Sequence, residues 1–139
     1  GRSQLGVMRF EAVSTLKDMA TDELAFYAAP AAGAGKVEYK GEAEVNGLKV
    51  HSVEYGYRGG FKVTRHFDAK DFHLVASDMP GQGGKVQRQV VDENTWVEGV
   101  SFTKKETILL DGKKVSAVEY TQVVVNHEVP DAAFAFPQR

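Results

Sequence analysis

The side chains best suited to chemistry in this sequence are its four histidines, which are His51, His66, His73 and His127. None belongs to a metal-binding pattern such as H-E-x-x-H, in which two histidines share one face of a helix. His66 and His73 lie on either side of an expected turn, so a hairpin could bring them together as a metal or acid–base pair. We favour the simpler interpretation that the histidines are solvent-facing residues of strands.

The other reactive groups give no catalytic pattern. Asp68 and Asp71 bracket the same turn, where aspartate commonly bonds to the backbone. General acid–base catalysis needs two positioned groups in one cleft, and no spacing here predicts such a pair. A G-x-S-x-G nucleophile motif and cysteine are both absent, and the glycine-rich residues 81–84 lack the following helix of a phosphate loop. We therefore predict a protein that is not an enzyme and has neither a cofactor nor a metal site.

Length and composition bound the remaining classes of function. A chain of 139 residues suits a single domain, here residues 1–139. The net charge is −2 and charged residues make up 26%, whereas a nucleic-acid binder usually carries a strongly basic patch. No apolar run approaches the roughly 20 residues that a membrane-spanning helix needs. We therefore expect no nucleic-acid partner and no transmembrane segment.

Residues 1–35 differ from the rest, because alanine and other helix-forming residues dominate them. Thr21 can cap a helix whose first turn contains two acidic residues, and Pro30 would end it. The spacing predicts one short helix over residues 21–28. The preceding segment GVMRFEAV could be a strand.

Residues 36–137 are rich in valine, threonine and aromatic residues, with turn signals at short intervals, which is typical of strands. Asn46-Gly47 and Asp111-Gly112 predict two-residue type I′ hairpin turns, because both central positions of such a turn need a positive φ. The segments around these turns resemble each other, and convergence of two hairpins in one sheet explains that as well as a repeat does. We predict an α+β fold with about eight strands, in an antiparallel and mostly meandering sheet with one apolar face.

Large apolar residues are the remaining candidates for a site. Alternating strand positions can place them either in a packed core or along a greasy groove, and periodicity alone leaves both open. The candidate groove residues are Val63, Phe67, Val86, Val90, Trp96, Phe102, Ile108, Val118 and Tyr120.

The order of several short motifs across residues 36–137 resembles the LolA/LolB-like superfamily of periplasmic outer-membrane lipoprotein-sorting proteins. A G-x-E-x-V-x-G hairpin opens the pattern, an aromatic-aspartate turn follows, and a V-x-V-N segment precedes a closing D-x-x-F-x-F-P. The matching residues are Gly41, Glu42, Val45, Gly47, Phe67, Asp68, Ala69, Val97, Gly99, Val100, Phe102, Val123, Val125, Asn126, Asp131, Phe134, Phe136 and Pro137.

This resemblance implies a sheet curved into an unclosed half β-barrel, with the short helix as its cover. It also implies a periplasmic carrier, or a cell-envelope lipoprotein whose anchor is missing from this chain, that binds lipoprotein acyl chains or another hydrophobic ligand without catalysis. The alternative is an interaction or sensor module of the same fold with a filled interior, which docks a periplasmic or outer-membrane protein partner.

Overall fold

The computed structural model describes residues 9–27, 35–125 and 128–135, and only the backbone of residues 24–27 and 134 among them. One helix, α1 (Phe10–Tyr27), precedes a single sheet. Its seven strands are β1 (Lys36–Val45), β2 (Leu48–Gly56), β3 (Lys62–Asp68), β4 (Leu74–Pro80), β5 (Val86–Val97), β6 (Val100–Leu110) and β7 (Lys113–Glu119). Two short 3-10 helices cover Gln82–Gly84 and Asp131–Phe134.

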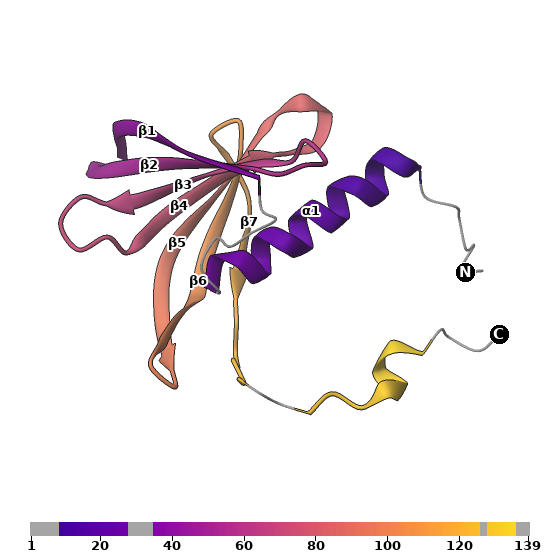
Figure 1. Ribbon diagram of the computed structural model, residues 1–139. Coiled ribbons are helices and arrows are strands. Elements are labelled where there is room, and N and C mark those ends of the chain that lie inside the picture. The colour runs from indigo at the N-terminus through magenta and orange to yellow at the C-terminus, as the bar shows by residue number, and fades with distance from the viewer. Residues whose placement is uncertain (1–8, 28–34, 126–127, 136–139) are drawn as a thin grey trace.

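The sheet is an open antiparallel meander, as the sequence predicted. Each strand pairs with the next one along the chain, in the order β1-β2-β3-β4-β5-β6-β7. Within the described residues β1 and β7 are the two edges, and the sheet does not close. The strands fan out around a common crossing point, which reflects a strong twist, and α1 runs beside the sheet with its N-terminal end projecting past it (Figure 1).

Three two-residue turns join neighbouring strands. Asn46 and Gly47 have φ values of 50° and 78°, and Asp111 and Gly112 have values of 47° and 77°. Both predicted hairpins are thus confirmed, and they form β1–β2 and β6–β7, the two edges of the sheet. A third turn at Glu98-Gly99, with φ values of 50° and 79°, joins β5 to β6. It escaped prediction because glutamate is not a typical residue for a positive φ.

Valine at Gly47 or Gly112 is expected to lower the free energy of unfolding by roughly 1–3 kcal/mol, because a β-branched residue is strained at positive φ. An added Cβ would meet nothing within 4 Å at either glycine, so backbone strain is the only cause. Urea denaturation measures the effect, with valine at the exposed strand residue Lys113 as the control. Denaturation midpoints equal to that of the parent in both glycine variants would contradict this explanation.

The helix is longer than predicted and begins eleven residues earlier. The Thr21 hydroxyl donates to the Lys17 carbonyl inside α1, so Thr21 is not an N-terminal cap. The possible strand over GVMRFEAV is wrong where the segment is described, because α1 includes Phe10–Val13. No proline or glycine interrupts residues 10–27, which is why the helix continues through the expected cap; Ala28 lies outside the described residues.

Two apolar clusters lie on opposite faces of the sheet, so the prediction of one apolar face is wrong. Side chains alternate along a strand, and Val50 and Tyr55 of β2 therefore point to different faces. The first cluster consists of Val45, Val50, Val75, Ala76 and Val90, with Leu109 against it. The second consists of Tyr57, Phe61 and Val63, with Tyr55 and Met79 against it.

Polar contacts hold α1 on the face of the second cluster. Asp22 makes a bidentate ion pair with Arg65 of β3 at 2.9 and 2.7 Å, and both side chains are more than nine-tenths buried. The Tyr57 hydroxyl also donates to Asp22, and the Phe61 amide donates to Asp18 at 3.2 Å. Burial, followed by the hydrogen bond to the Asp22 carboxylate, raises the pKa of the Tyr57 hydroxyl. The polar edge of the helix thus faces the sheet.

Three large apolar side chains of α1 are left exposed. Phe10 is 84% exposed, Leu16 50% and Met19 38%. The C-terminal segment is also exposed over residues 128–133 and lies apart from the sheet (Figure 1). The side chains of Phe134 and Phe136, which belong to the closing D-x-x-F-x-F-P motif, lie outside what the structure describes.

Candidate functional site

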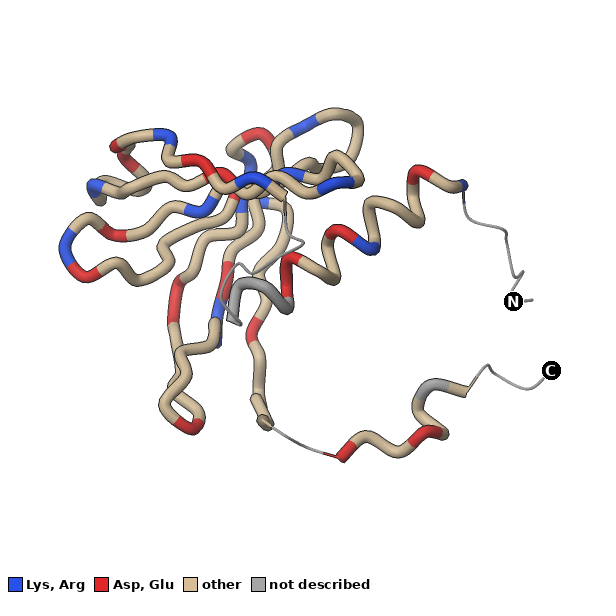
Figure 2. The backbone as a smooth tube through the Cα atoms, in the orientation of Figure 1, with Lys and Arg blue, Asp and Glu red and all other residues tan. Residues whose placement is uncertain are grey.

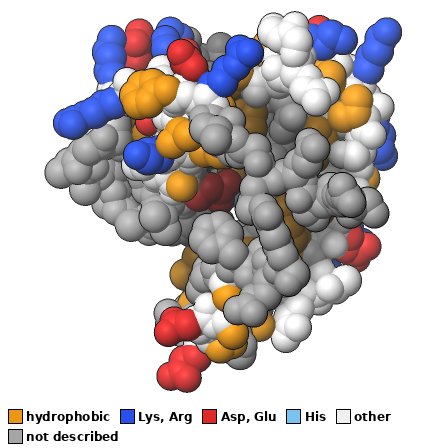
Figure 3. Space-filling model, turned by 90° about the vertical axis from the view of Figure 1, so that its right-hand side faces the viewer, with side chains coloured by type: hydrophobic (Ala, Val, Ile, Leu, Met, Phe, Trp, Pro, Cys, Tyr) orange, Lys and Arg blue, Asp and Glu red, His pale blue; other side chains and the backbone are white. Residues whose placement is uncertain are grey.

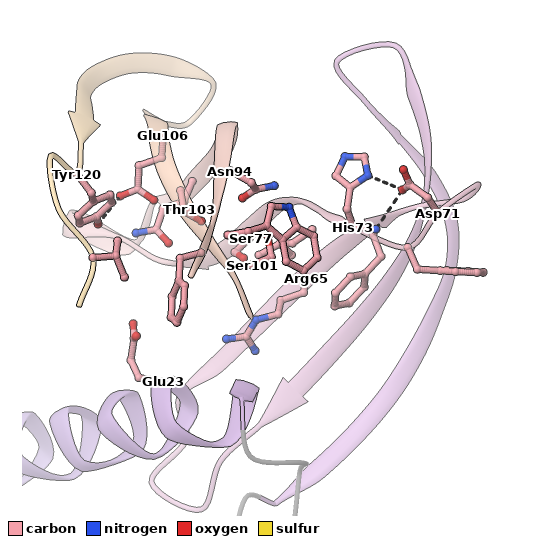
Figure 4. Close-up of a pocket in the computed structure, with 17 residues that line it drawn as sticks. Glu23, Arg65, Asp71, His73, Ser77, Asn94, Ser101, Thr103, Glu106 and Tyr120 are labelled. Carbon is pink, nitrogen blue, oxygen red and sulfur yellow. Dashed lines mark hydrogen bonds and ion pairs between the residues drawn. The ribbon is translucent and has the colours of Figure 1, made fainter. Parts of the chain in front are cut away.

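A cavity of about 770 Å³ lies between α1 and the sheet face that carries Arg65. Its polar floor is a row of residues from adjacent strands. Arg65 of β3 pairs with Ser77 of β4, which pairs with Gln89 of β5. Asn94 and Thr103, another directly opposed pair, continue the polar lining on β5 and β6. Figure 4 shows Arg65, Ser77, Asn94 and Thr103 around the same space, with α1 along one side.

Aromatic and aliphatic side chains form the walls of this cavity. Trp96 is 72% exposed and Phe72 is 64% exposed, so both present apolar surface to the opening. Phe72 has a φ of 61°, which is uncommon for a bulky residue, and its ring stacks on His51 at 5.9 Å. The full apolar lining is Phe67, Phe72, Leu74, Trp96, Phe102, Tyr120 and Val123.

Four of the nine residues predicted to line a groove come together at this cavity, namely Phe67, Trp96, Phe102 and Tyr120. The other five lie elsewhere. Val63 and Val90 belong to the two buried clusters, Val86 is 52% exposed, and Ile108 and Val118 are half-buried outside the lining.

Strand register explains this separation for two of the five residues, which lie in β5. Gln89 of β5 faces the cavity, so Val86 and Val90, which have the opposite parity in the same strand, point to the other face of the sheet.

The polar floor was missed because only apolar residues were considered as candidates. The sequence feature that could have identified the floor is the alternation of side chains along β3. Arg65 lies two residues before Phe67 and is therefore on the same face of the sheet. Gln87 and Gln89 show the same alternation against Val86 and Val90.

One end of the cavity is acidic. Glu106 is 9% exposed and accepts a hydrogen bond from the Tyr120 hydroxyl at 3.2 Å. Glu23 of α1 rises toward these two residues in Figure 4. Burial, then the charge of Glu106 and its hydrogen bond, raises the pKa of the Tyr120 hydroxyl, and Glu23 adds to the effect. In Figure 3, recessed acidic atoms are visible beside hydrophobic side chains.

The β3–β4 turn carries Asp68, Asp71 and His73, whose ligand atoms all lie within 4.8 Å of one another. Internal hydrogen bonds account for this grouping. Asp68 accepts from the Lys70 amide at 2.7 Å, and Asp71 accepts from the amide and ring of His73. The His73 ring bond lowers the pKa of the Asp71 carboxyl. These contacts are the turn chemistry that the sequence suggested.

A buried polar ladder crosses the opposite face of the sheet. The Ser52 hydroxyl lies 2.8 Å from His66 Nδ1, and His66 Nε2 lies 2.9 Å from Asp78. Arg88 makes two bonds to the same Asp78 carboxylate at 2.6 and 2.7 Å. His66 is 6% exposed, so its interpretation as a solvent-facing histidine is wrong. It bonds to Ser52 and Asp78, whereas the His73 ring bonds to Asp71.

This Ser-His-Asp series has the residue types of a hydrolase triad but not its setting. Ser52 is 5% exposed, and none of the ladder residues lines the cavity. Burial alone would raise the pKa of the Asp78 carboxyl, but the hydrogen bonds from Arg88 and His66 outweigh it and hold that pKa well below its usual range. The ladder therefore satisfies buried polar groups across β2 to β5.

No family model, curated protein or solved structure matches this chain. The resemblance to the LolA/LolB-like superfamily therefore stays a prediction from sequence motifs. No helix within the described ranges is long and apolar enough to cross a membrane.

Proposed function

We propose that this protein is a non-catalytic binding protein, which holds the hydrocarbon part of an amphiphilic ligand in the cavity between α1 and the sheet. The observation that carries this proposal is the aromatic wall of a cavity of about 770 Å³. Ligand sites in proteins typically enclose about 300–1,000 Å³. Trp96 and Phe72 are exposed at the opening, and a bound chain would cover them.

Burial of a ligand's hydrocarbon chain in this cavity can supply enough free energy for reversible binding. Burying roughly 300 Å² of apolar surface contributes about 7–8 kcal/mol at the usual coefficient. Ordering of the ligand opposes part of this gain. A micromolar dissociation constant, which corresponds to about −8 kcal/mol, is therefore near the upper range that hydrocarbon contacts alone would supply.

The motif resemblance supports the more specific parts of the proposal. On that basis the sheet curves as a half β-barrel with α1 as its cover, the ligand is an acyl chain of a lipoprotein or a related lipid, and the compartment is the periplasm or cell envelope. The polar floor of Arg65, Ser77 and Gln89 adds that the ligand has a polar part as well as a hydrocarbon chain.

The exposed apolar side chains of α1 favour a second candidate function, which is docking of a protein partner. Phe10, Leu16 and Met19 are exposed, whereas Asp18 and Asp22 of the same helix make the contacts that anchor it. A periplasmic or outer-membrane protein could cover these exposed side chains while the cavity holds a ligand. A module with a filled interior is less well supported, because the described residues leave the cavity open.

Binding can be measured through Trp96, which is the only tryptophan of the chain. Dodecyl maltoside, added below its micelle concentration, is expected to shift Trp96 emission to the blue with saturation and a micromolar dissociation constant. Aspartate at Phe67 or Phe102 should weaken binding at least tenfold, because a charge in the apolar wall opposes burial of hydrocarbon.

The matched control is Val86→Asp, which introduces the same charge at an exposed position outside the cavity. Its affinity should equal that of the parent. Thermal melts of each variant separate lost binding from lost folding. A well-folded parent that shows no saturable change in Trp96 emission would overturn the carrier proposal and favour the docking function.

A further inference from the structure

The cavity lining has an excess of negative charge when residues already paired with each other are set aside. Arg65 lines the cavity, but its guanidinium already makes two bonds to Asp22. Asp71 at the other end is likewise engaged with His73. Glu106 and Glu23 form no ion pair with any described residue, and both line the cavity.

Glu106 is the stronger feature of the two because it is buried. Its only described hydrogen-bond donor is the Tyr120 hydroxyl, at 3.2 Å from Oε1. A buried carboxylate is costly unless it is paired with a charge or fully hydrogen-bonded. A cation that entered the cavity would supply a partner that the described residues do not.

The position of Glu106 within the cavity also suits a cation. Figure 4 shows Glu106, Tyr120 and Glu23 at one end, away from His73 and Asp71. The lining also includes Phe102 and Trp96, and aromatic rings attract ammonium groups through their negative faces. Figure 2 shows acidic positions recurring along α1 toward the sheet, and Glu23 is the one among them that lines the cavity.

We infer that the polar end of the ligand is an ammonium group, which lies at Glu106, Glu23 and Tyr120 while its hydrocarbon chain follows the aromatic wall. The inference rests on the proposed binding function and specifies the ligand class for the same cavity. It excludes free fatty acids as the preferred ligands, since their carboxylate would meet Glu106 at short range.

Three amphiphiles with the same dodecyl chain test this inference: dodecyltrimethylammonium, dodecyl maltoside and dodecyl sulfate. Each is titrated into the full chain below its micelle concentration at physiological salt, where non-specific attraction is screened within about 8 Å, and Trp96 emission reports binding. We expect the ammonium compound to bind at least tenfold more tightly than the maltoside, and the sulfate to bind most weakly.

Glu106→Gln should reduce the preference for the ammonium compound over the maltoside to less than threefold. Glu23→Gln, at an exposed position, provides a second variant that leaves the sheet intact. The control is Glu42→Gln on β1, which removes the same charge outside the cavity and should keep the full preference.

The outcomes separate the two proposals. Saturable binding of the maltoside with equal or weaker binding of the ammonium compound would overturn the ammonium inference and leave the carrier function standing. An ammonium preference that survives in both Glu106→Gln and Glu23→Gln would also overturn it. Failure of all three amphiphiles to bind would refute the binding function and the ammonium inference together.

Discussion

Replacing Arg65 with methionine is expected to lower the free energy of unfolding by about 3–5 kcal/mol, the usual cost of breaking a buried ion pair. Methionine keeps most of the aliphatic stem, so packing changes little. Asp22 would be left buried with the Tyr57 hydroxyl as its remaining described partner. Urea denaturation followed by circular dichroism measures the loss.

The double variant Asp22→Leu and Arg65→Met is the control for this result. Buried ion pairs replaced by apolar residues of similar size often cost little, so the double variant should be more stable than Arg65→Met alone. If Arg65→Met loses less than about 1 kcal/mol, the range of an exposed salt bridge, the pair does not anchor the helix.

The second large effect is expected at Val90, which is 6% exposed within the cluster opposite the helix. Asparagine there loses apolar burial and places an amide without a partner in the core, for a combined cost of roughly 2–5 kcal/mol. Val86→Asn, on the same strand and the same face but 52% exposed, should change stability by less than about 0.5 kcal/mol.

Both changes are measured as shifts of the urea midpoint. Equal shifts for the two variants would mean that the face opposite the helix is solvated and that the Val90 cluster is not a core. A large loss of stability in Val86→Asn and none in Val90→Asn would mean that Val86, and not Val90, is the buried residue of β5.

Local sequence signals were sufficient for much of the fold. A two-residue turn depends on its own backbone, so Asn46-Gly47 and Asp111-Gly112 identified both edge hairpins. The antiparallel meander follows because strands joined by short turns must pair with their neighbours. The helix start was not predictable in this way, because α1 runs through Thr21 without the cap that its sequence suggested.

Which sheet face each strand residue points to depends on contacts between residues that are distant in the sequence. Register shifts interrupt the pairing at Tyr39/Gly41 and at His66/Phe67, and each changes which residues meet across strands. The contact that decides which face receives α1 joins Asp22 to Arg65, 43 residues apart. Sequence periodicity therefore identified Phe67 and Phe102 as apolar candidates but could not separate them from Val63 and Val90, which lie in the two clusters.

The strand order of the sheet also bears on how quickly the chain can find its structure. Every strand pairs with its sequence neighbour, so each pairing closes only a short loop, and loop-closure entropy stays small at every step. Folds dominated by such short-range contacts cross their folding barrier faster than folds of similar size with distant pairings. The contacts of Asp18 and Asp22 with the sheet span 35 to 43 residues. The smaller entropy cost of the short loops therefore favours formation of the sheet first. The helix α1, which forms a wall of the cavity, is expected to dock on the sheet last.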